Sequence, residues 1–309
     1  MRAVGYARNR LSFFLNMKNN KSLGQISSLI QLLTDRDEFV RSSIRDKLVE
    51  LGEDTLPFLE IATRGEDESL RIQAQLVIQK ILPNKLAEKF RQLALKGQGQ
   101  DVDLEAGMIL IMEFGYPESN PEICRQKLDD LAQKLTEILD FNADPQEIVA
   151  VFTRFLFQEN RFNGNKDNYH NPENSFINKV LENHMGLPIT LSALCILLAK
   201  RLGLPIVGVG MPGHYIVKYS LPIEPIYFDP FHKGRLLTKN ECIKIVKQLG
   251  YPFEEHYLSQ STQRETLVRM LNNLIQVYKN SNEIKKAATL SEYVKILLNP
   301  SKKPSERIH

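Results

Sequence analysis

The sequence predicts an α+β fold in which a central helix packs against an antiparallel sheet, flanked on both sides by all-α helical repeats. Three observations predict it. Apolar residues recur at helical spacing from residue 22 to residue 82, one strongly amphipathic segment is followed at once by short β-branched and aromatic runs, and helical spacing returns after residue 260. With 309 residues, the chain is long enough for two or three compact units.

The composition is that of an ordinary globular protein. Hydrophobic residues make up 42% and charged residues 25%, which excludes a wholly disordered chain and a fibrous repeat. The net charge of +3 indicates no nucleic-acid partner, and no run reaches the ~18 apolar residues of a membrane span. Three cysteines without a CxxC pair suit a reducing compartment, so we expect a cytoplasmic protein. We expect no cofactor.

Both ends of the chain are predicted to be disordered tails. Residues 1–21 are basic, and no acidic residue precedes Asp35, which resembles an organelle transit segment weakly. A frayed basic tail, or a true start at Met17, explains the same pattern. Residues 301–309 are polar and contain a proline.

Residues 22–95 are predicted to form HEAT-like helical repeats. The strings DEFVRSSI, from Asp37, and DESLRIQA, from Asp67, share an acidic pair, an aliphatic residue and an arginine. They repeat at an offset of 30 residues, and a repeat of this length indicates stacked helix pairs. The pattern resembles a HEAT-type repeat, in which the arginine (Arg41, Arg71) commonly pairs with a neighbouring acid. The repeats would offer a binding surface or a helical cap. The polar, Gly-bearing run at 96–100 is typical of a linker.

Residues 101–260 are predicted to form the central domain. Three helices with apolar stripes come first and carry no evident chemistry. An irregular Asn-rich segment follows between Asn160 and Gly186, and its length favours a functional role over a plain connector. Pro188 then begins a helix that ends at Gly203, and three short runs between 205 and 230 are typical of antiparallel strands.

His214 and Asp229 are the strongest candidate catalytic pair. His214 follows the turn at Gly213 and opens a strand, and Asp229 closes another strand 15 residues later, so the side chains can meet on one sheet face. A carboxylate that holds an imidazole in one tautomer is what a base near neutral pH requires. A histidine satisfied within the core or at the surface is the alternative. No metal is predicted, because the other candidate ligands do not show metal-ligand spacing; these are Glu173, His170 and His232.

The stretch from Asn163 to Leu237 resembles the transglutaminase-like superfamily, in particular its bacterial SirB-type branch. The strings that carry the resemblance are NPENSFINKVLE, GLPITLSALCILLAKRLGLPIVGVGMPGHYIVKY and FDPFHKGRLL. The resemblance implies a papain/transglutaminase-like core followed by a TPR tail. It also implies a triad in which a cysteine starts the central helix and a histidine and an aspartate lie on successive strands. His214 and Asp229 match the last two.

The cysteine of that triad has no counterpart in this sequence. In active relatives it stands some 15 residues before the glycine that ends the central helix, and that position holds Pro188, which offers no nucleophile. Cys195 lies two turns farther along, within the apolar stripe, so we expect a buried thiol with a raised pKa. Cys124 and Cys242 lie on other helices.

Polar residues around the start of the central helix are the remaining site candidates. Thr190 and Ser192 would be nucleophiles activated by His214, or caps and packing elements, as such hydroxyls more commonly are. The resemblance implies that Asn174 and Ser175 line the site or support it, although either could cap the next helix. We group these two with Gly213 as candidate binding residues.

Residues 261–300 are predicted to form a TPR-like helix pair. Leu274, Tyr278 and Ala287 fit the spacing of one such unit, while Ile275 and Ser291 replace the small and aromatic residues usual there. A single unit would pack on the core as a cap or bind a peptide.

Two functions of different classes follow. The first is a transglutaminase-like pseudoenzyme that lacks thiol acyl transfer and acts as a protein-interaction or regulatory module with a protein partner. The second is a hydrolase or acyltransferase in which the His214–Asp229 pair activates a hydroxyl or a water. A pure repeat-type adaptor with an inert centre is a third possibility.

Overall fold

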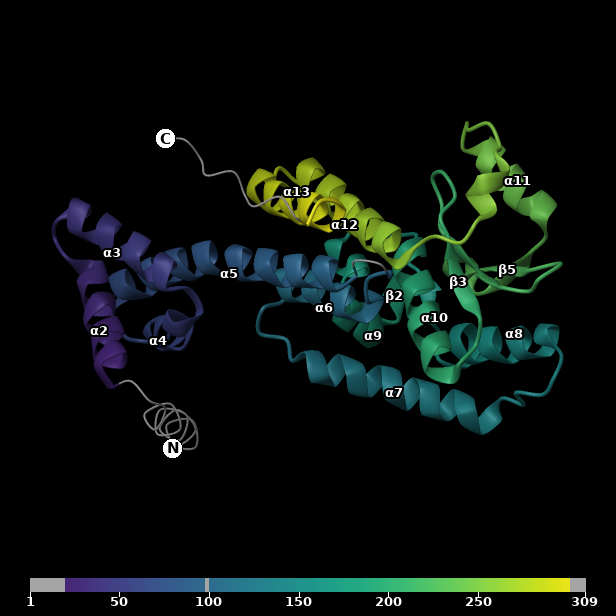
Figure 1. Ribbon diagram of the computed structural model, residues 1–309, viewed down its shortest axis with the longest axis horizontal. Helices are drawn as coiled ribbons and strands as arrows, with labels where there is room; N and C mark the ends of the chain where they lie inside the picture. Colours follow the sequence, from purple (N-terminus) through teal and green to yellow (C-terminus); the bar gives the residue numbers. More distant parts are fainter. Residues whose placement is uncertain (1–19, 98–99, 301–309) are drawn as a thin grey trace. The chain divides into compact units, whose positions relative to one another are not determined.

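The computed structural model describes residues 20–97 and 100–300 (Figure 1). Residues 1–19 of the predicted tail at 1–21, the predicted tail at 301–309 and residues 98–99 of the predicted linker lie outside this range. Residues 20–21 are the first two of a helix, so the prediction of a disordered tail is wrong for them. The chain divides into two compact units, the first up to Lys85 and the second from Leu86. Each unit has its own buried core.

The first unit is entirely helical in its described part. Its elements are α2 (Asn20–Gln31), η1 (Leu32–Thr34), α3 (Glu38–Leu51), η2 (Gly52–Thr55), α4 (Leu56–Ala62) and the beginning of α5 (Glu68–Lys96). The apolar stripes predicted from the sequence meet in one core, whose buried members are Ile26, Ile30, Leu33, Leu48, Leu56, Leu59, Ala62, Ala74, Val77 and Ile81.

The two similar strings of this unit make similar local contacts. Asp37 and Asp67 each accept a hydrogen bond from a backbone N–H in the first turn of the helix that follows. Arg41 and Arg71 each donate to backbone carbonyl groups of the loop before their own helix, and Arg41 also pairs with Glu38. The shared residues therefore begin a helix and hold the preceding loop against it.

The second unit is a mixed α+β structure. Its helices after α5 are α6 (Leu104–Gly115), α7 (Pro121–Ile138), α8 (Pro145–Arg154), the π-helical turn η3 (Phe155–Glu159), η4 (Pro172–Ser175), α9 (Ile177–Asn183), α10 (Pro188–Leu202), η5 (Pro230–His232), α11 (Lys239–Gln248), η6 (Glu255–Leu258), α12 (Gln263–Asn280) and α13 (Ile284–Leu298). Helix α10 is buried on nearly every side and packs against α7, α12, β3 (Ile206–Val209) and β4 (Ile216–Tyr219). It is the centre of the unit.

A four-stranded antiparallel sheet lies beside α10. Its order is β3-β4-β5-β6, where β5 is Ile226–Asp229 and β6 is Arg235–Leu237. The register pairs Val209 with Ile216 and Asp229 with Arg235. Consecutive strands are neighbours because each connection is short, so residues at the β3–β4 turn and at the end of β5 come close together.

A second, two-stranded sheet joins the Asn-rich segment to the start of α10. Strands β1 (Asn163–Gly164) and β2 (Met185–Gly186) run parallel, and Gly164 pairs with Gly186. Helix α12 packs against α13 and also against α6 and α10, so the C-terminal helix pair belongs to the second unit. Within the described residues, no helix is long and apolar enough to cross a membrane.

Gly164 lies where β1 passes too close to η5 for a side chain. An added Cβ atom would lie 2.3 Å from the ring of Phe231 and 2.5 Å from its carbonyl oxygen. We therefore expect Gly164→Ala to lower the free energy of unfolding by about 1–3 kcal/mol, measured by denaturant titration. Gly24→Ala is the control, because nothing lies within 4 Å of a Cβ added there. Wild-type stability of Gly164→Ala would contradict this close packing.

Candidate functional site

Asp229 is the buried centre of the candidate site. It is the last residue of β5, and Pro230 follows as the first residue of η5. Its Oδ1 atom accepts hydrogen bonds from the backbone N–H groups of Phe231, at 3.0 Å, and His232, at 3.2 Å. Only 2% of the residue is exposed. The turn at the end of β5 therefore fixes the carboxylate and leaves Oδ2 for side-chain donors.

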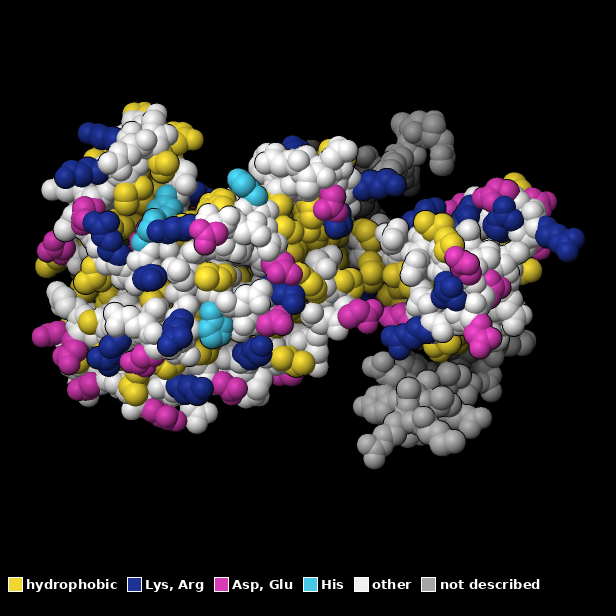
Figure 2. All heavy atoms as spheres, turned by 180° about the vertical axis from the view of Figure 1, so that it is seen from behind, with side chains coloured by type: hydrophobic (Ala, Val, Ile, Leu, Met, Phe, Trp, Pro, Cys, Tyr) yellow, Lys and Arg dark blue, Asp and Glu magenta, His cyan; other side chains and the backbone are white. Residues whose placement is uncertain are grey.

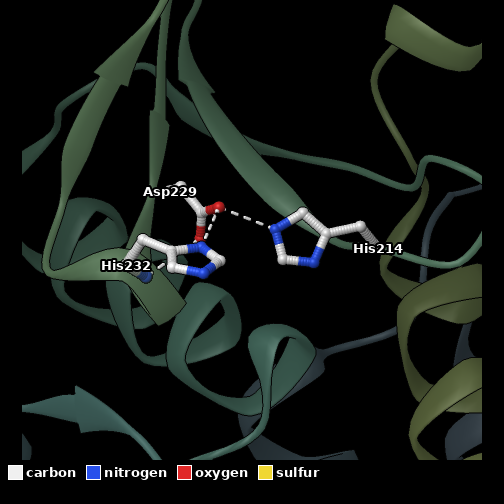
Figure 3. A group of neighbouring side chains, drawn as sticks. All are labelled: His214, Asp229 and His232. Carbon is white, nitrogen blue, oxygen red and sulfur yellow. Dashed lines mark hydrogen bonds and ion pairs between the residues drawn. The ribbon is translucent and has the colours of Figure 1, made fainter. Parts of the chain in front are cut away.

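His214 contacts this carboxylate from the β3–β4 turn. Its Nε2 atom lies 2.7 Å from Oδ2 of Asp229 (Figure 3). Because an ionised carboxylate only accepts hydrogen bonds, Nε2 carries a proton, and in the neutral ring the lone pair is therefore on Nδ1. No other described residue forms a hydrogen bond with Nδ1. The sequence predicted that His214 and Asp229 could meet, and they do, although β4 begins two residues after His214 rather than at it.

The turn that carries His214 is held by its backbone. Gly213 has a φ angle of +71°, in the left-handed region that glycine adopts without strain. The N–H of His214 donates to the carbonyl oxygen of Met211 at 3.3 Å. The carbonyl oxygen of His214 accepts from Nη2 of Arg269, on α12, at 2.9 Å. Gly213 therefore has a structural role in this turn, separate from the binding role predicted for it.

His232 is a third member of the site, although its spacing in the sequence predicted no role for it. Its Nδ1 atom lies 2.8 Å from Oδ2 of Asp229, the same oxygen that His214 contacts (Figure 3). Its side chain is 45% exposed, whereas that of His214 is 11% exposed. The string Asp-Pro-Phe-His, with the histidine three residues after a strand-ending aspartate, is the signal that could have revealed it.

Two opposing effects act on the pKa of Asp229. Burial raises it, because a charged carboxylate is poorly solvated inside the protein. Hydrogen bonds and charge attraction from His214 and His232 lower it, and together they hold the pKa below its usual value. Asp229 therefore stays ionised and keeps both rings in place.

The same three side chains have the composition of a two-histidine, one-carboxylate metal site. Their ligand atoms lie within 4.8 Å of one another. A metal bound by both nitrogens at about 2.1 Å would require them to lie no more than about 4.2 Å apart, and both ring nitrogens would have to lose their protons. The hydrogen bonds to Asp229 account for the observed arrangement without an ion.

A cavity of about 310 Å³ opens beside this cluster. Figure 2 shows histidine and hydrophobic side chains close together next to the lobe that contains α11. The cavity is lined by polar groups of the cluster and by apolar and polar residues of β6 and α11: Gly213, His214, Asp229, His232, Arg235, Leu237, Ile245, Gln248 and Leu249.

The start of α10 lies next to the His214 segment but presents no exposed nucleophile. Pro188 is its first residue, and Thr190 and Ser192 are fully buried. Ser192 Oγ lies 3.5 Å from the carbonyl oxygen of Tyr215, and Thr190 Oγ1 has no hydrogen-bond partner among the described residues. Neither hydroxyl forms a hydrogen bond with His214. Because Pro188 and Ser192 are four residues apart, they share the helix face that meets this segment.

All three thiols are buried and unpaired. Burial raises the pKa of Cys195 far above its usual value, raises that of Cys242 to about 12 and raises that of Cys124. Cys124 Sγ lies 3.4 Å from Met112 Sδ, and Cys242 belongs to the core between the sheet and α11. None is a thiolate at neutral pH, and none forms a hydrogen bond with His214.

Asn174 and Ser175 support the Asn-rich segment. The side chain of Asn174 donates to the backbone carbonyls of Asn168, at 2.8 Å, and Tyr169, at 3.1 Å, and accepts from Asn165 at 2.9 Å. Ser175 Oγ is buried and has no hydrogen-bond partner in the described part of the protein. Neither side chain caps α9, so that alternative is wrong. Asn174 shapes the loop rather than contacting His214.

Asp229→Asn should lower stability in a pH-dependent way. Since the folded pKa of Asp229 is lowered, its charge stabilises the fold above the ordinary carboxyl range, and this contribution is lost as the pH falls through the lowered pKa. We expect the variant to be about 2 kcal/mol less stable at pH 7, and the difference to shrink in acid, in urea titrations. Exposed Asp167→Asn is the control. A difference independent of pH would contradict the argument.

Comparison with known proteins places this site in a family. Residues 122–272 match the family described as the transglutaminase-like superfamily. No solved structure matches the protein. A UPF0162 protein of Xylella fastidiosa strain 9a5c is 32% identical over 202 residues, which cover 63% of this chain and 72% of the relative.

Two further relatives match over shorter stretches. A UPF0162 protein of Vibrio cholerae is 28% identical over 140 residues, 45% of this chain and 52% of that protein. Human F-box only protein 21 is 28% identical over 141 residues, 43% of this chain and 22% of that protein. The chain is therefore a member of the UPF0162 family within the transglutaminase-like superfamily.

Proposed function

We propose that this protein performs no thiol-dependent acyl transfer and uses its transglutaminase-like domain as a protein-interaction module. The observation that carries the proposal is the state of its thiols: Cys124, Cys195 and Cys242 are all buried with raised pKa values. Pro188 occupies the helix start where the resemblance implies a cysteine. A thiolate nucleophile is therefore missing from the site.

In this proposal, the cavity beside His214 binds a segment of a protein partner. The cavity is lined by imidazole and carboxylate groups and also by apolar residues such as Leu237 and Leu249. Such a mixture suits a peptide, which offers both amide groups and side chains. The match to F-box only protein 21 covers only 22% of that protein, which is consistent with a domain used as a module in different proteins.

We also propose a family branch for the protein and a repeat type for the helical segments before and after the domain. This proposal places the protein in the SirB-type branch, with HEAT-like repeats before the domain and a TPR-like pair, α12 and α13, after it. The helical first unit and the two similar strings at Asp37 and Asp67 support the first part. The contacts of α12 with α6 and α10 favour a cap over a separate peptide-binding unit.

Water-dependent hydrolysis is the second candidate, and one observation favours it. His214 donates through Nε2 to Asp229, so its Nδ1 lone pair is available to take a proton from water. This alternative keeps the His214–Asp229 pair as a base and needs neither a thiol nor a protein hydroxyl.

An activity assay separates the two functions. Glutamine-containing peptides and casein are incubated with the protein, and ammonia release, peptide cleavage and incorporation of a fluorescent amine are followed. We expect no rate above that of His214→Ala, because no nucleophile stands beside the imidazole. Any rate that His214→Ala abolishes would refute the module proposal and favour hydrolysis.

Restoring a thiol tests the position of Pro188. We expect Pro188→Cys to react with iodoacetamide in the folded protein, and more slowly when His214→Ala is added, because the imidazole assists deprotonation. The wild-type protein is the control, and its three buried thiols should stay unlabelled until it is denatured. Labelling is measured by mass spectrometry of peptides. If the thiol introduced by Pro188→Cys were as inert to the reagent as Cys195, position 188 would lie outside the reach of His214.

A further inference from the structure

Arg269 is a partly buried cation that contacts the turn carrying His214 and lies next to, rather than within, the lining of the cavity. From α12, its Nη2 donates to the carbonyl oxygen of His214 at 2.9 Å, and its guanidinium carbon lies 5.5 Å from the centre of the Tyr215 ring. Burial lowers the pKa of Arg269. Arginine nevertheless stays charged at neutral pH, so the charge is held against the turn that carries His214.

This guanidinium has no acidic partner among the described residues. Another partly buried arginine of the same unit is paired: Arg201 contacts Glu105 and Asp129 at 2.7 and 2.6 Å. Arg264 also lacks a carboxylate but donates to two backbone carbonyls. Arg269 makes one such bond and leaves the rest of its donor fork free. No nitrogen of Arg269 is among the buried atoms without a partner in the described residues, so its remaining N–H groups stay accessible to water or to a ligand.

Aromatic residues surround Arg269 and connect it to the histidine cluster. Charge interaction with Tyr169, Tyr215 and Tyr251 raises the pKa of Arg269 and so opposes the lowering by burial. The ring of Tyr169 packs edge-on against Phe231 with centroids 5.9 Å apart, and Phe231 packs against His214 at 6.5 Å. The remaining N–H groups of the guanidinium are charged donors that an anion can use.

We propose that Arg269 binds a carboxylate group of the peptide that occupies the His214 site. The inference rests on the proposed function, and it adds the chemistry of the partner: an acidic side chain or a terminal carboxyl group. A planar carboxylate fits the remaining N–H groups of the fork. The bound carboxylate would lie beside the turn of Gly213 and His214.

Nuclear magnetic resonance titration of the full-length ¹⁵N-labelled protein tests this proposal. Four probes are compared: N-acetylglutamate amide, whose carboxylate is on the side chain; N-acetylglutamine, whose carboxylate is terminal; neutral N-acetylglutamine amide; and inorganic phosphate. We expect at least one carboxylate probe to shift the amide signals of Gly213 and His214 saturably. The stronger of the two identifies the source of the carboxylate, and the neutral probe should leave the signals unchanged.

Substitutions identify the cation responsible. Arg269→Gln should weaken binding at least tenfold, and Lys279→Gln, which removes an exposed charge from the same helix, should leave it unchanged. Arg269→Lys keeps the charge but loses the fork and should also bind at least several-fold more weakly, so a folding defect in Arg269→Gln leaves the test intact. Wild-type binding by Arg269→Lys would overturn the proposal, as would equal binding of the neutral probe, a preference for phosphate, or no binding of either carboxylate.

The readout is independent of the activity assay. Probe binding is seen in the spectrum whether or not any bond is cleaved. A His214-dependent hydrolysis would therefore refute the interaction-module proposal and leave the carboxylate site standing. Failure of the carboxylate probes would refute only the carboxylate site.

Discussion

The carboxylate of Asp229 is the group on which the candidate site depends. Its two oxygens accept four hydrogen bonds: two from the backbone N–H groups of η5 and two from the rings of His214 and His232. The backbone donors fix the carboxylate, and the carboxylate in turn fixes both rings. Because it is almost fully buried, losing any donor would leave a desolvated charge unmatched.

Helix α10 determines what chemistry is possible around that carboxylate. The helix is buried because it fills the space between the sheet, α7 and α12, and its side chains are selected for packing. Cys195 belongs to this packing, and so do the hydroxyls of Thr190 and Ser192. The fold thus keeps the geometry that orients a histidine while the groups that a histidine would activate are enclosed in the core.

Local signals in the sequence were enough to predict part of this arrangement. The antiparallel strands and the turn at Gly213 place His214 opposite Asp229, since short connections make consecutive strands neighbours. His232 was missed because its role depends on the η5 turn, which folds it back onto Asp229. Arg269 was missed for a different reason. It lies 55 residues after His214 on a helix with an ordinary apolar stripe, and only tertiary packing of α12 brings it to the turn.

Arg269 has no carboxylate partner among the described residues, in contrast to the two histidines. A partly buried cation and a buried carboxylate in one site would normally attract each other. Both oxygens of Asp229, however, are already engaged by four donors from η5 and the β3–β4 turn. Within the described residues, Arg269 donates its hydrogen bond to the carbonyl oxygen of His214 and lies over the ring of Tyr215. The site therefore carries a carboxylate whose acceptors are engaged and a cation with N–H donors left over, and that asymmetry favours a ligand with negative charge.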